Sequence, residues 1–481
     1  MKKCIALILT LAAILSVLAA CGSAESKPAA GETTAAPGSD KLLVGYAAVN
    51  ITPEGSVPLA GYGRTLTRMS TGTLSYLFIT CTAITGTNGE TILNYGMDLI
   101  GGSEAYSFAS KVTEATGVPE KNIIMSASHT HSAPDFSHDQ LKTVQDFRQN
   151  LGVALVKAAE QAMANRCPAE MYIATVQTEG LNFVRRYVLE NGTYAGDNYG
   201  DFSSSPIASH ESEVDNTMQL VKFVREGDKD VILANFQTHP HRTGGTTRYD
   251  LSADIVGRFR DSLSAKLDCY VSYFTGGSGN VNPTSRVGEE NIYADWKAHG
   301  DALADAAFSA EGSYVKVEGT KVQATSVTYT GTINHTEDHL VDKAREVQEY
   351  YNNGGTWSGA MEMGKEYGIL GAFHAGAIIS KSQRPATQDV PIFAHSVGNV
   401  AFVAAPYEMF DTNGMEIKEG SPFEMTLIMT CANGSVGYMP SALGWEHGGY
   451  SVQTSRFVSG TAEAFVAEYL GMLNTLYETK D

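Results

Sequence analysis

The sequence predicts an α/β protein, a single large domain with a mixed β-sheet core flanked by helices. Three observations lead to this prediction. Short apolar runs of strand length alternate along the chain with longer runs of helical periodicity. Of the 481 residues, 43% are hydrophobic and 18% are charged, which is enough apolar material for a large core. The 48 glycines indicate many tight turns, which a helical bundle does not require.

The first segment of the chain has the pattern of an export signal. Residues 1–20 combine a basic start with an apolar run that is short for a membrane span of about 20 residues. The run ends in Leu-Ala-Ala-Cys21, which resembles a bacterial lipobox. We therefore expect residues 1–20 to be a lipoprotein signal peptide. A lipid on Cys21 would anchor the protein outside the bacterial cell membrane; an ordinary cleaved signal is the alternative.

Residues 21–40 are rich in Ala, Ser, Thr, Pro and Gly and are predicted to form a flexible tether. Residues 41–481 are predicted to form the folded domain. The apolar runs predict strands at 91–95, 123–127, 171–176, 218–224, 231–236, 270–274 and 400–405. The helical patterns predict helices at 151–164, 254–266, 339–351 and 462–476. The segment 334–383 is either a lid or a plain surface excursion.

The charge balance bears on the partners of the protein. With 53 acidic and 34 basic residues the net charge is −19, which repels phosphate backbones. We therefore expect no nucleic-acid partner, and no protein partner is evident from the sequence. The cysteines of the predicted domain are widely spaced, without a CxxC pair, and allow either up to two disulfides or free thiols: Cys81, Cys167, Cys269 and Cys431.

Three predicted strands end in side chains that bind metal ions. The strand 123–127 leads into His129 and His131, which face the same way if the chain is extended. The strand 231–236 leads to His239, and the strand 400–405 to Glu408. Open α/β sheets bind ligands beyond the carboxyl ends of their strands, and two imidazoles with a carboxylate are ligands of hydrolytic zinc sites.

Each of these signals has an ordinary structural interpretation when taken alone. A His-X-His pair is often a solvated loop or a hydrogen-bonded pair. Glu408 could be an acid at a helix N-terminus, where the helix dipole favours it. Asp98, just beyond the strand 91–95, could accept a histidine N–H or cap a turn. The joint occurrence of three such strand ends favours a Zn²⁺ site.

The motif SASHTHSAP at residues 126–134 resembles the SHTHSGP signature of the neutral (non-lysosomal) ceramidase family. Further blocks are similar to those of the family and follow in its order: residues 45–53 with 61–63, 182–187, 235–240, 279–283 and 405–408, and the two Gly-Tyr pairs at 437–438 and 449–450. The resemblance covers nearly all of residues 41–481 and implies a divergent, lipoprotein member of this family.

The resemblance also implies roles for individual residues. It implies that Zn²⁺ is held by His129, His239, Glu408 and Tyr438. It further implies that His131 is an active-site histidine and that Arg185 and Tyr450 stabilise the developing oxyanion. Position 282, where the family has the serine proposed as catalytic, is Asn282, and Asn280 replaces an aspartate. Because asparagine is not a nucleophile, an acyl-serine route through this position is excluded.

The expected function is therefore that of a zinc-dependent amidohydrolase that cleaves an N-acyl amide bond, with ceramide, which yields a sphingoid base and a fatty acid, as the family's substrate. A zinc amidase or esterase for another N-acyl or cell-envelope substrate is a second hypothesis. A solute-binding lipoprotein that captures its ligand without cleaving it is a third. The substrate would be a small molecule or a lipid in each case.

Overall fold

The computed structural model describes residues 40–480 except 198–199, 201 and 289–292. The predicted signal peptide of residues 1–20, and the predicted tether as far as residue 39, lie outside the described residues. Within the described part, none of the helices combines the length and apolar character needed to cross a bilayer.

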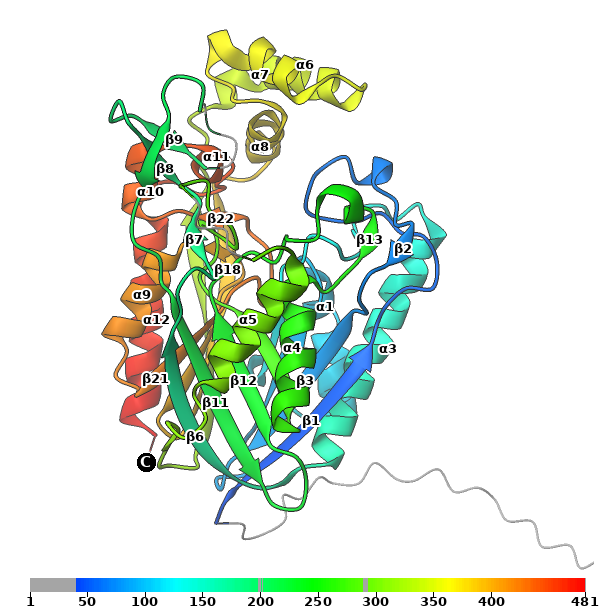
Figure 1. Cartoon of the computed structure of the whole chain (residues 1–481), viewed down its shortest axis with the longest axis vertical. Helices are drawn as coiled ribbons and strands as arrows, with labels where there is room; N and C mark the ends of the chain where they lie inside the picture. The colour runs from blue at the N-terminus through cyan, green and yellow to red at the C-terminus, as the bar shows by residue number, and fades with distance from the viewer. Residues whose placement is uncertain (1–39, 198–199, 201, 289–292, 481) are drawn as a thin grey trace, which may run out of the picture. The chain divides into compact units, whose positions relative to one another are not determined.

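A nine-stranded mixed sheet forms the centre of the domain (Figure 1). Its strands are β1 (Leu42–Asn50), β3 (Phe78–Thr85), β4 (Thr91–Met97), β5 (Ile123–Ala127), β6 (Cys167–Gln177), β11 (Thr217–Arg225), β12 (Val231–Phe236), β14 (Tyr270–Thr275) and β16 (Val315–Lys316). The order is β14-β12-β11-β6-β1-β3-β4-β5, with β16 added beside β6. The pairs β4–β5 and β12–β14 are parallel, and the others are antiparallel.

A second sheet of four strands packs against the first. It has the order β17 (Val322–Thr332), β18 (Thr387–Val397), β19 (Val400–Ala404) and β21 (Met425–Met429). One apolar cluster contains side chains of both sheets, among them Val44 and Phe274 of the large sheet and Phe402 and Leu427 of the small one. The alternation of side chains along each strand leaves the opposite face of each sheet to be covered by helices.

Three groups of helices cover these outer faces (Figure 1). The helix α3 (Lys142–Ala164) packs on the β1–β5 part of the large sheet, together with α2 (Ala109–Thr116). The helices α4 (Asp254–Leu267) and α5 (Trp296–Phe308) pack on β11, β12 and β14. On the small sheet lie α9 (Asp411–Gly420) and α12 (Thr461–Glu478), whose Phe465, Tyr469 and Leu473 are buried at helical spacing.

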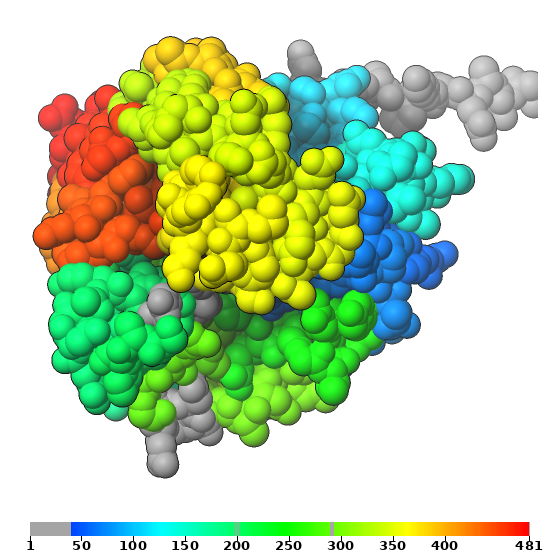
Figure 2. All heavy atoms as spheres, turned by 90° about the horizontal axis from the view of Figure 1, so that it is seen from above, coloured from blue at the N-terminus to red at the C-terminus, as the bar shows by residue number. Residues whose placement is uncertain are grey.

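A helical excursion has a small core of its own. It consists of α6 (Val341–Asn352), α7 (Trp357–Gly364) and α8 (Ala372–Ser382), with the 3₁₀ turns η4 (Asp338–Leu340) and η5 (Lys365–Tyr367). These helices lie together beside α11 in Figure 1 and form the yellow surface in Figure 2. The remaining short elements include β7 (Phe183–Val184), β8 (Tyr187–Leu189), β9 (Tyr194–Gly196), β10 (Ile207–His210), β15 (Val281–Asn282), β20 (Glu408–Met409), β22 (Tyr438–Met439), α10 (Ala442–His447) and α11 (Tyr450–Gln453).

The large sheet curls so that its two ends meet, which places β5 next to β14 although they stand at opposite ends of the strand order. Small residues permit this approach. A Cβ on Gly96 would lie 2.8 Å from the carbonyl oxygen of Tyr273, and Ser272 Oγ donates to Thr80 Oγ1 across the gap (3.0 Å). Thr275 Oγ1, at the end of β14, donates to the carbonyl of Ser128 just beyond β5 (2.8 Å). The carboxyl ends of β5, β12 and β14 therefore face one site.

The predicted fold class is confirmed, since a mixed sheet flanked by helices forms the core. All seven predicted strands occur, and β5 and β12 have the predicted bounds. The helix α3 begins at Lys142, nine residues before the predicted start. The strands β1, β3 and β16 of the large sheet and three strands of the second sheet were not predicted. The four cysteines of the domain are free thiols, which settles the alternative left open for them.

Candidate metal centre

His129 and His239 are anchored in the same way, each through its Nδ1 atom. His129 follows β5 in a left-handed conformation (φ 68°), and its Nδ1–H donates to the carbonyl of Ile100 (2.6 Å). His239 follows β12, and its Nδ1–H donates to the carbonyl of Ser278 (2.7 Å). Because a carbonyl only accepts hydrogen bonds, these bonds fix the tautomer and leave both Nε2 atoms available as ligands.

Glu408 brings a carboxylate to both Nε2 atoms. Its Oε2 lies 3.4 Å from His129 Nε2 and 3.2 Å from His239 Nε2. The side chain is 17% exposed, but Oε2 itself is buried and makes no standard hydrogen bond, nor does His239 Nε2. Burial opposes ionisation, yet the two histidines outweigh it and hold the pKa of Glu408 well below its usual value. The carboxylate is therefore charged at neutral pH.

These separations fit a single bound cation. Ligand atoms about 2.0–2.2 Å from a tetrahedral zinc ion lie about 3.4 Å from one another. The observed 3.2 and 3.4 Å match this spacing, and polar atoms buried without a hydrogen-bond partner require a counterpart. The buried His129 and His239 and the half-buried His131 form a cluster that could hold a metal ion, with ligand atoms within 4.8 Å of one another. The donor set of nitrogen and oxygen suits zinc.

The surroundings shift the pKa values of the two anchored histidines in opposite directions. Burial lowers the pKa of His129, but Cys431 and Glu408 outweigh it and raise that pKa well above the usual value. Burial and the nearby Arg185 lower the pKa of His239 to about 3, so this imidazole is neutral. Because a histidine must lose its proton to bind a metal ion, the affinity of this site for a cation should decrease as the pH is lowered.

His131 is the third histidine of this cluster, and both of its ring nitrogens are without a hydrogen-bond partner. Nδ1 and Nε2 are buried and have no hydrogen-bond partner. The ring centroid is 5.1 Å from that of His129 and 4.9 Å from that of Tyr62. Burial and the neighbouring histidines lower the pKa of His131 well below its usual value. Gly61 adopts φ +100°, and a Cβ there would lie 2.4 Å from the His131 ring, so only glycine fits.

Tyr438, Arg185 and Tyr450 form the wall beside Glu408. The short strands β20 and β22 pair in parallel with Glu408 opposite Tyr438. Arg185 Nη2 donates to Tyr438 Oη (3.0 Å) and to the carbonyl of Gly279 (2.7 Å), while its buried Nε has no partner. The ring of Tyr450 lies 5.5 Å from that of Tyr438. Burial and Glu408 raise the pKa of Tyr438 well above its usual value, so the phenol is neutral without a metal.

The structure adds a hydrogen-bonded pair, His241 and Asn282, to which the sequence analysis gave no role. His241 Nε2 donates to Asn282 Oδ1 (2.9 Å), and its ring lies 5.5 Å from that of His131. The second His-X-His spacing, at 239 and 241, was the available signal. Asn282 stands on β15, whose Val281 carbonyl accepts from the backbone N–H of His239. Asn280 is not at the centre, since its side chain bonds Asp411.

The suggested contact between Asp98 and a histidine is wrong. Asp98 is buried and forms an ion pair with Arg260, whose Nη1 donates to Oδ1 (2.8 Å), and it also accepts from the backbone N–H of Phe78. The histidines take backbone carbonyls instead. A buried carboxylate is stabilised more by charge-assisted hydrogen bonds from a guanidinium than by a hydrogen bond from a neutral imidazole.

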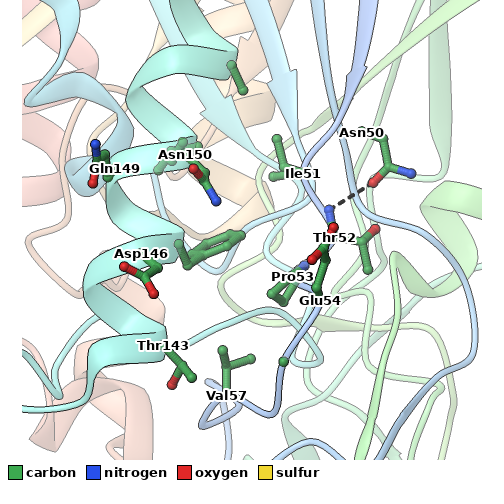
Figure 3. Close-up of a pocket in the computed structure, with 14 residues that line it drawn as sticks. Asn50, Ile51, Thr52, Pro53, Glu54, Val57, Thr143, Asp146, Gln149 and Asn150 are labelled. Carbon is green, nitrogen blue, oxygen red and sulfur yellow. Dashed lines mark hydrogen bonds between the residues drawn. The ribbon is translucent and has the colours of Figure 1, made fainter.

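A cavity elsewhere in the described part of the protein is not lined by any of these histidines. It has a volume of about 610 Å³ and lies between residues 50–57 and α3 (Figure 3). Its acidic side chains are Glu54 and Asp146, and Asp146 accepts from Lys142 (2.7 Å). The amide N–H of Thr52 donates to Asn50 Oδ1 (2.8 Å), the bond drawn in Figure 3. No histidine or cysteine lines this cavity, so we assign it no chemistry.

Comparison with known proteins gives a match at the level of structure. No protein-family model matches the chain, and a search of curated proteins finds no match. The neutral ceramidase from Pseudomonas aeruginosa is similar in structure, with a TM-score of 0.67 and 16% identity over 91% of this chain and 75% of that chain. A ceramidase complexed with C2 has the same TM-score and identity, over 91% and 76%. The fold that the sequence resemblance implied is thus confirmed.

Proposed function

We propose that the protein is a zinc-dependent amidohydrolase that cleaves a linear N-acyl amide bond, as a ceramidase does. The observation that carries the proposal is the convergence of three ligand atoms, His129 Nε2, His239 Nε2 and Glu408 Oε2, from chain positions far apart. The fold shared with a neutral ceramidase supports the amide as the bond that is cleaved. Ceramide itself is one member of the proposed substrate class.

Zinc would be held by His129, His239 and Glu408, with the Tyr438 phenol as the fourth protein donor. When bound, zinc supplies Lewis acidity, which polarises a carbonyl and makes water more acidic. The carbonyls of Ile100 and Ser278 keep both imidazoles in the tautomer that this role needs.

Arg185 is placed to stabilise negative charge on the substrate oxygen. Its guanidinium is held by the Gly279 carbonyl and by Tyr438, and its Nε–H remains unbonded and buried. A fixed donor of this kind contributes roughly 2.7–4 kcal/mol to the transition state of acyl transfer. Tyr450, next to Tyr438, is proposed as the second donor.

His131 is proposed to carry the proton. Its ring is neutral near pH 7, because burial lowers its pKa, and both nitrogens lack a partner. A ring nitrogen can therefore take a proton from the attacking water and give it to the amine when the C–N bond breaks. The water oxygen stays on the acyl carbon, so a carboxylic acid and an amine are released. Asn282, held by His241, orients the site and takes no part in bond making.

The protein is also proposed to be anchored outside the bacterial cell membrane. A lipid on Cys21, followed by the tether to residue 40, would keep the domain outside the cell membrane and close to lipid substrates. The sequence pattern of residues 1–21 is the support for this.

Amine release from purified, zinc-loaded protein tests the function. Short-chain ceramide in mixed micelles and simple N-acylethanolamines should both be assayed, before and after removal of the metal by a chelator. We expect turnover that is lost with the metal, returns with zinc and is absent in Glu408→Gln. The variant Glu416→Gln, in α9, is the matched control and should keep full activity. Binding of these amides without turnover in the zinc-loaded protein would favour a solute-binding function instead.

A further inference from the structure

A second cavity adjoins the metal centre and has walls rich in aromatic rings. Its volume is about 380 Å³, and the helical excursion and α11 provide much of its lining. Trp357 begins α7, Phe373 lies on α8 and Tyr450 begins α11. The excursion therefore lines a cavity. The sequence analysis had left open whether residues 334–383 form a lid or a plain surface excursion, and had predicted no cavity there. We call this cavity the aromatic pocket.

The rings of the aromatic pocket form a continuous series that leads to the metal centre. The centroids of Trp357 and Phe373 are 5.0 Å apart, and those of Phe373 and Tyr450 are 5.8 Å apart. Tyr450 then contacts Tyr438, the register partner of Glu408. Tyr450 is thus the wall that the aromatic pocket shares with the metal centre.

A second path links the two places through the loop at residues 61–63. Gly61 touches the His131 ring, and Gly63 touches Phe373: a Cβ on Gly63, at φ +65°, would lie 2.8 Å from that ring. Two residues of chain span at most about 7 Å, so this short loop contacts both His131 and Phe373. A molecule with one group in the aromatic pocket can therefore extend along this loop to His131.

The pocket suits a compact group. A volume of about 380 Å³ is at the lower end of the range for ligand-binding cavities, about 300–1,000 Å³. One wall is closed by backbone, since a Cβ on Gly449 would lie 3.0 Å from the Cα of Gly196. The rings are inclined to each other by 55° and 59° and so offer both faces and edges, an arrangement that favours another aromatic ring.

We propose that the aromatic pocket binds a phenyl-sized aromatic substituent of the amide that is cleaved at the metal centre. The inference rests on the proposed amidohydrolase function and specifies its substrate class. The ring can belong to the acyl part or to the amine part of the substrate, and an experiment must distinguish these two sources.

Matched eight-carbon substrates provide the test with zinc-loaded protein. In the acyl arm, N-phenylacetylethanolamine is compared with N-octanoylethanolamine. In the amine arm, N-acetylphenethylamine is compared with N-acetyloctylamine. We expect the aromatic member of one arm to have a kcat/KM about tenfold above its alkyl partner, equivalent to about 1.4 kcal/mol, because ring–ring contacts add to the free energy of burying apolar area.

Variants locate the source of the preference. Trp357→Ala removes one wall, and Met361→Trp fills the cavity, since Met361 also lines it. Both should bring the aromatic-to-alkyl ratio of kcat/KM close to one. Tyr367→Ala is the control, because Tyr367 belongs to the same excursion but is exposed and does not line the pocket. An alkyl preference in both arms, or a ratio that neither variant changes, would overturn the proposal.

Failure of the proposed function would look different. In that case the zinc-loaded protein cleaves none of the four amides, and their binding is measured by calorimetry instead. Tighter binding of an aromatic amide that Met361→Trp abolishes would support the aromatic pocket without hydrolysis. Equal binding of aromatic and alkyl amides would overturn it.

Discussion

At the residue scale, His131 is the group whose role differs most clearly from that of its neighbours. His129 and His239 are anchored by carbonyls, whereas both nitrogens of His131 have no partner. An anchored imidazole is suited to hold a metal ion, and an unanchored one is suited to exchange protons. The two histidines of the His-X-His motif therefore differ in how they are held, and we propose different roles for them.

We predict that His131→Ala lowers kcat about 100-fold or more and leaves the zinc content unchanged, because general acid–base groups contribute about 10²–10⁴ to the rate. Metal analysis and steady-state kinetics on the same preparation provide the measurement. Loss of zinc in this variant would show that His131 is a ligand, as its place in the histidine cluster allows.

Much of the site at this scale could be predicted from the sequence, because strand ends carry side chains to one edge of a sheet. His129, His239 and Glu408 were selected on that ground, and the structure brings them together. The partners of these residues could not be predicted. Every residue has a backbone carbonyl, so the sequence does not indicate that the carbonyl of Ile100 accepts from His129. Asp98 forms an ion pair with Arg260, which is 162 positions away in the chain.

At the scale of elements, the helical excursion is held by a partly buried cluster of Glu337, His374 and Lys381. Glu337 accepts from His374 Nε2 (2.8 Å) and from Lys381 Nζ (3.0 Å), and Lys381 also donates to the carbonyl of Gln453 (3.2 Å). Lys381 is only 3% exposed. This lysine ties α8 to α11, the helix that carries Tyr450, so the cluster positions two walls of the aromatic pocket.

Glu337→Gln should destabilise the excursion by roughly 2 kcal/mol, because it leaves the buried Lys381 without a countercharge; the partial exposure of Glu337 limits the effect. Hydrogen exchange should become faster in α8 and remain unchanged in β12. Glu346→Gln removes an exposed ion pair with Lys343 and is the control. Equal protection of α8 in the wild type and in Glu337→Gln would contradict this account of the cluster.

Buried strands and helices were predicted from the sequence more accurately than exposed ones. Strands such as β12, buried on both faces, are continuous apolar runs and were predicted with the observed bounds. The strand β17 has exposed and half-buried residues along most of its length and includes Thr and Ser, so it gave no apolar run. The start of α3 carries Lys142, Gln145 and Asp146, which conceal its helical periodicity.

At the scale of the whole molecule, buried neutral histidines make stability depend on pH. His395, on β18, donates from Nε2 to the carbonyl of Lys121 (3.0 Å), and burial lowers its pKa to about 4. The unfolded chain takes up this proton near pH 6.5, before the folded protein does. The contribution of His395 is therefore complete above pH 6.5 and is lost as the pH falls toward about 4.

His395→Gln should reduce the slope of the unfolding free energy against pH, between pH 4 and 6.5, by up to about 1.4 kcal/mol per pH unit. Urea unfolding at several pH values measures this slope. His339→Gln, at an exposed position, controls for the loss of a histidine elsewhere. An unchanged slope in His395→Gln would show that His395 does not stay neutral in the folded protein.

The curl of the large sheet is the feature on which the metal centre depends, because it joins the end of β5 to the ends of β12 and β14. The strand order alone places these ends far apart, and the small residues Gly96, Thr80 and Ser272 allow them to meet. Sequence patterns specify single strands but carry no such signal for how a sheet closes.

Metal analysis of the purified, zinc-loaded protein tests the central claim most directly, since it asks whether one cation joins the three ligands. We predict about one zinc ion per chain in the wild type and less than a tenth of that in His239→Ala and Glu408→Gln. His241→Gln should keep its metal, because His241 bonds Asn282 instead. A wild-type chain without bound zinc, or full zinc occupancy in both ligand variants, would contradict the account.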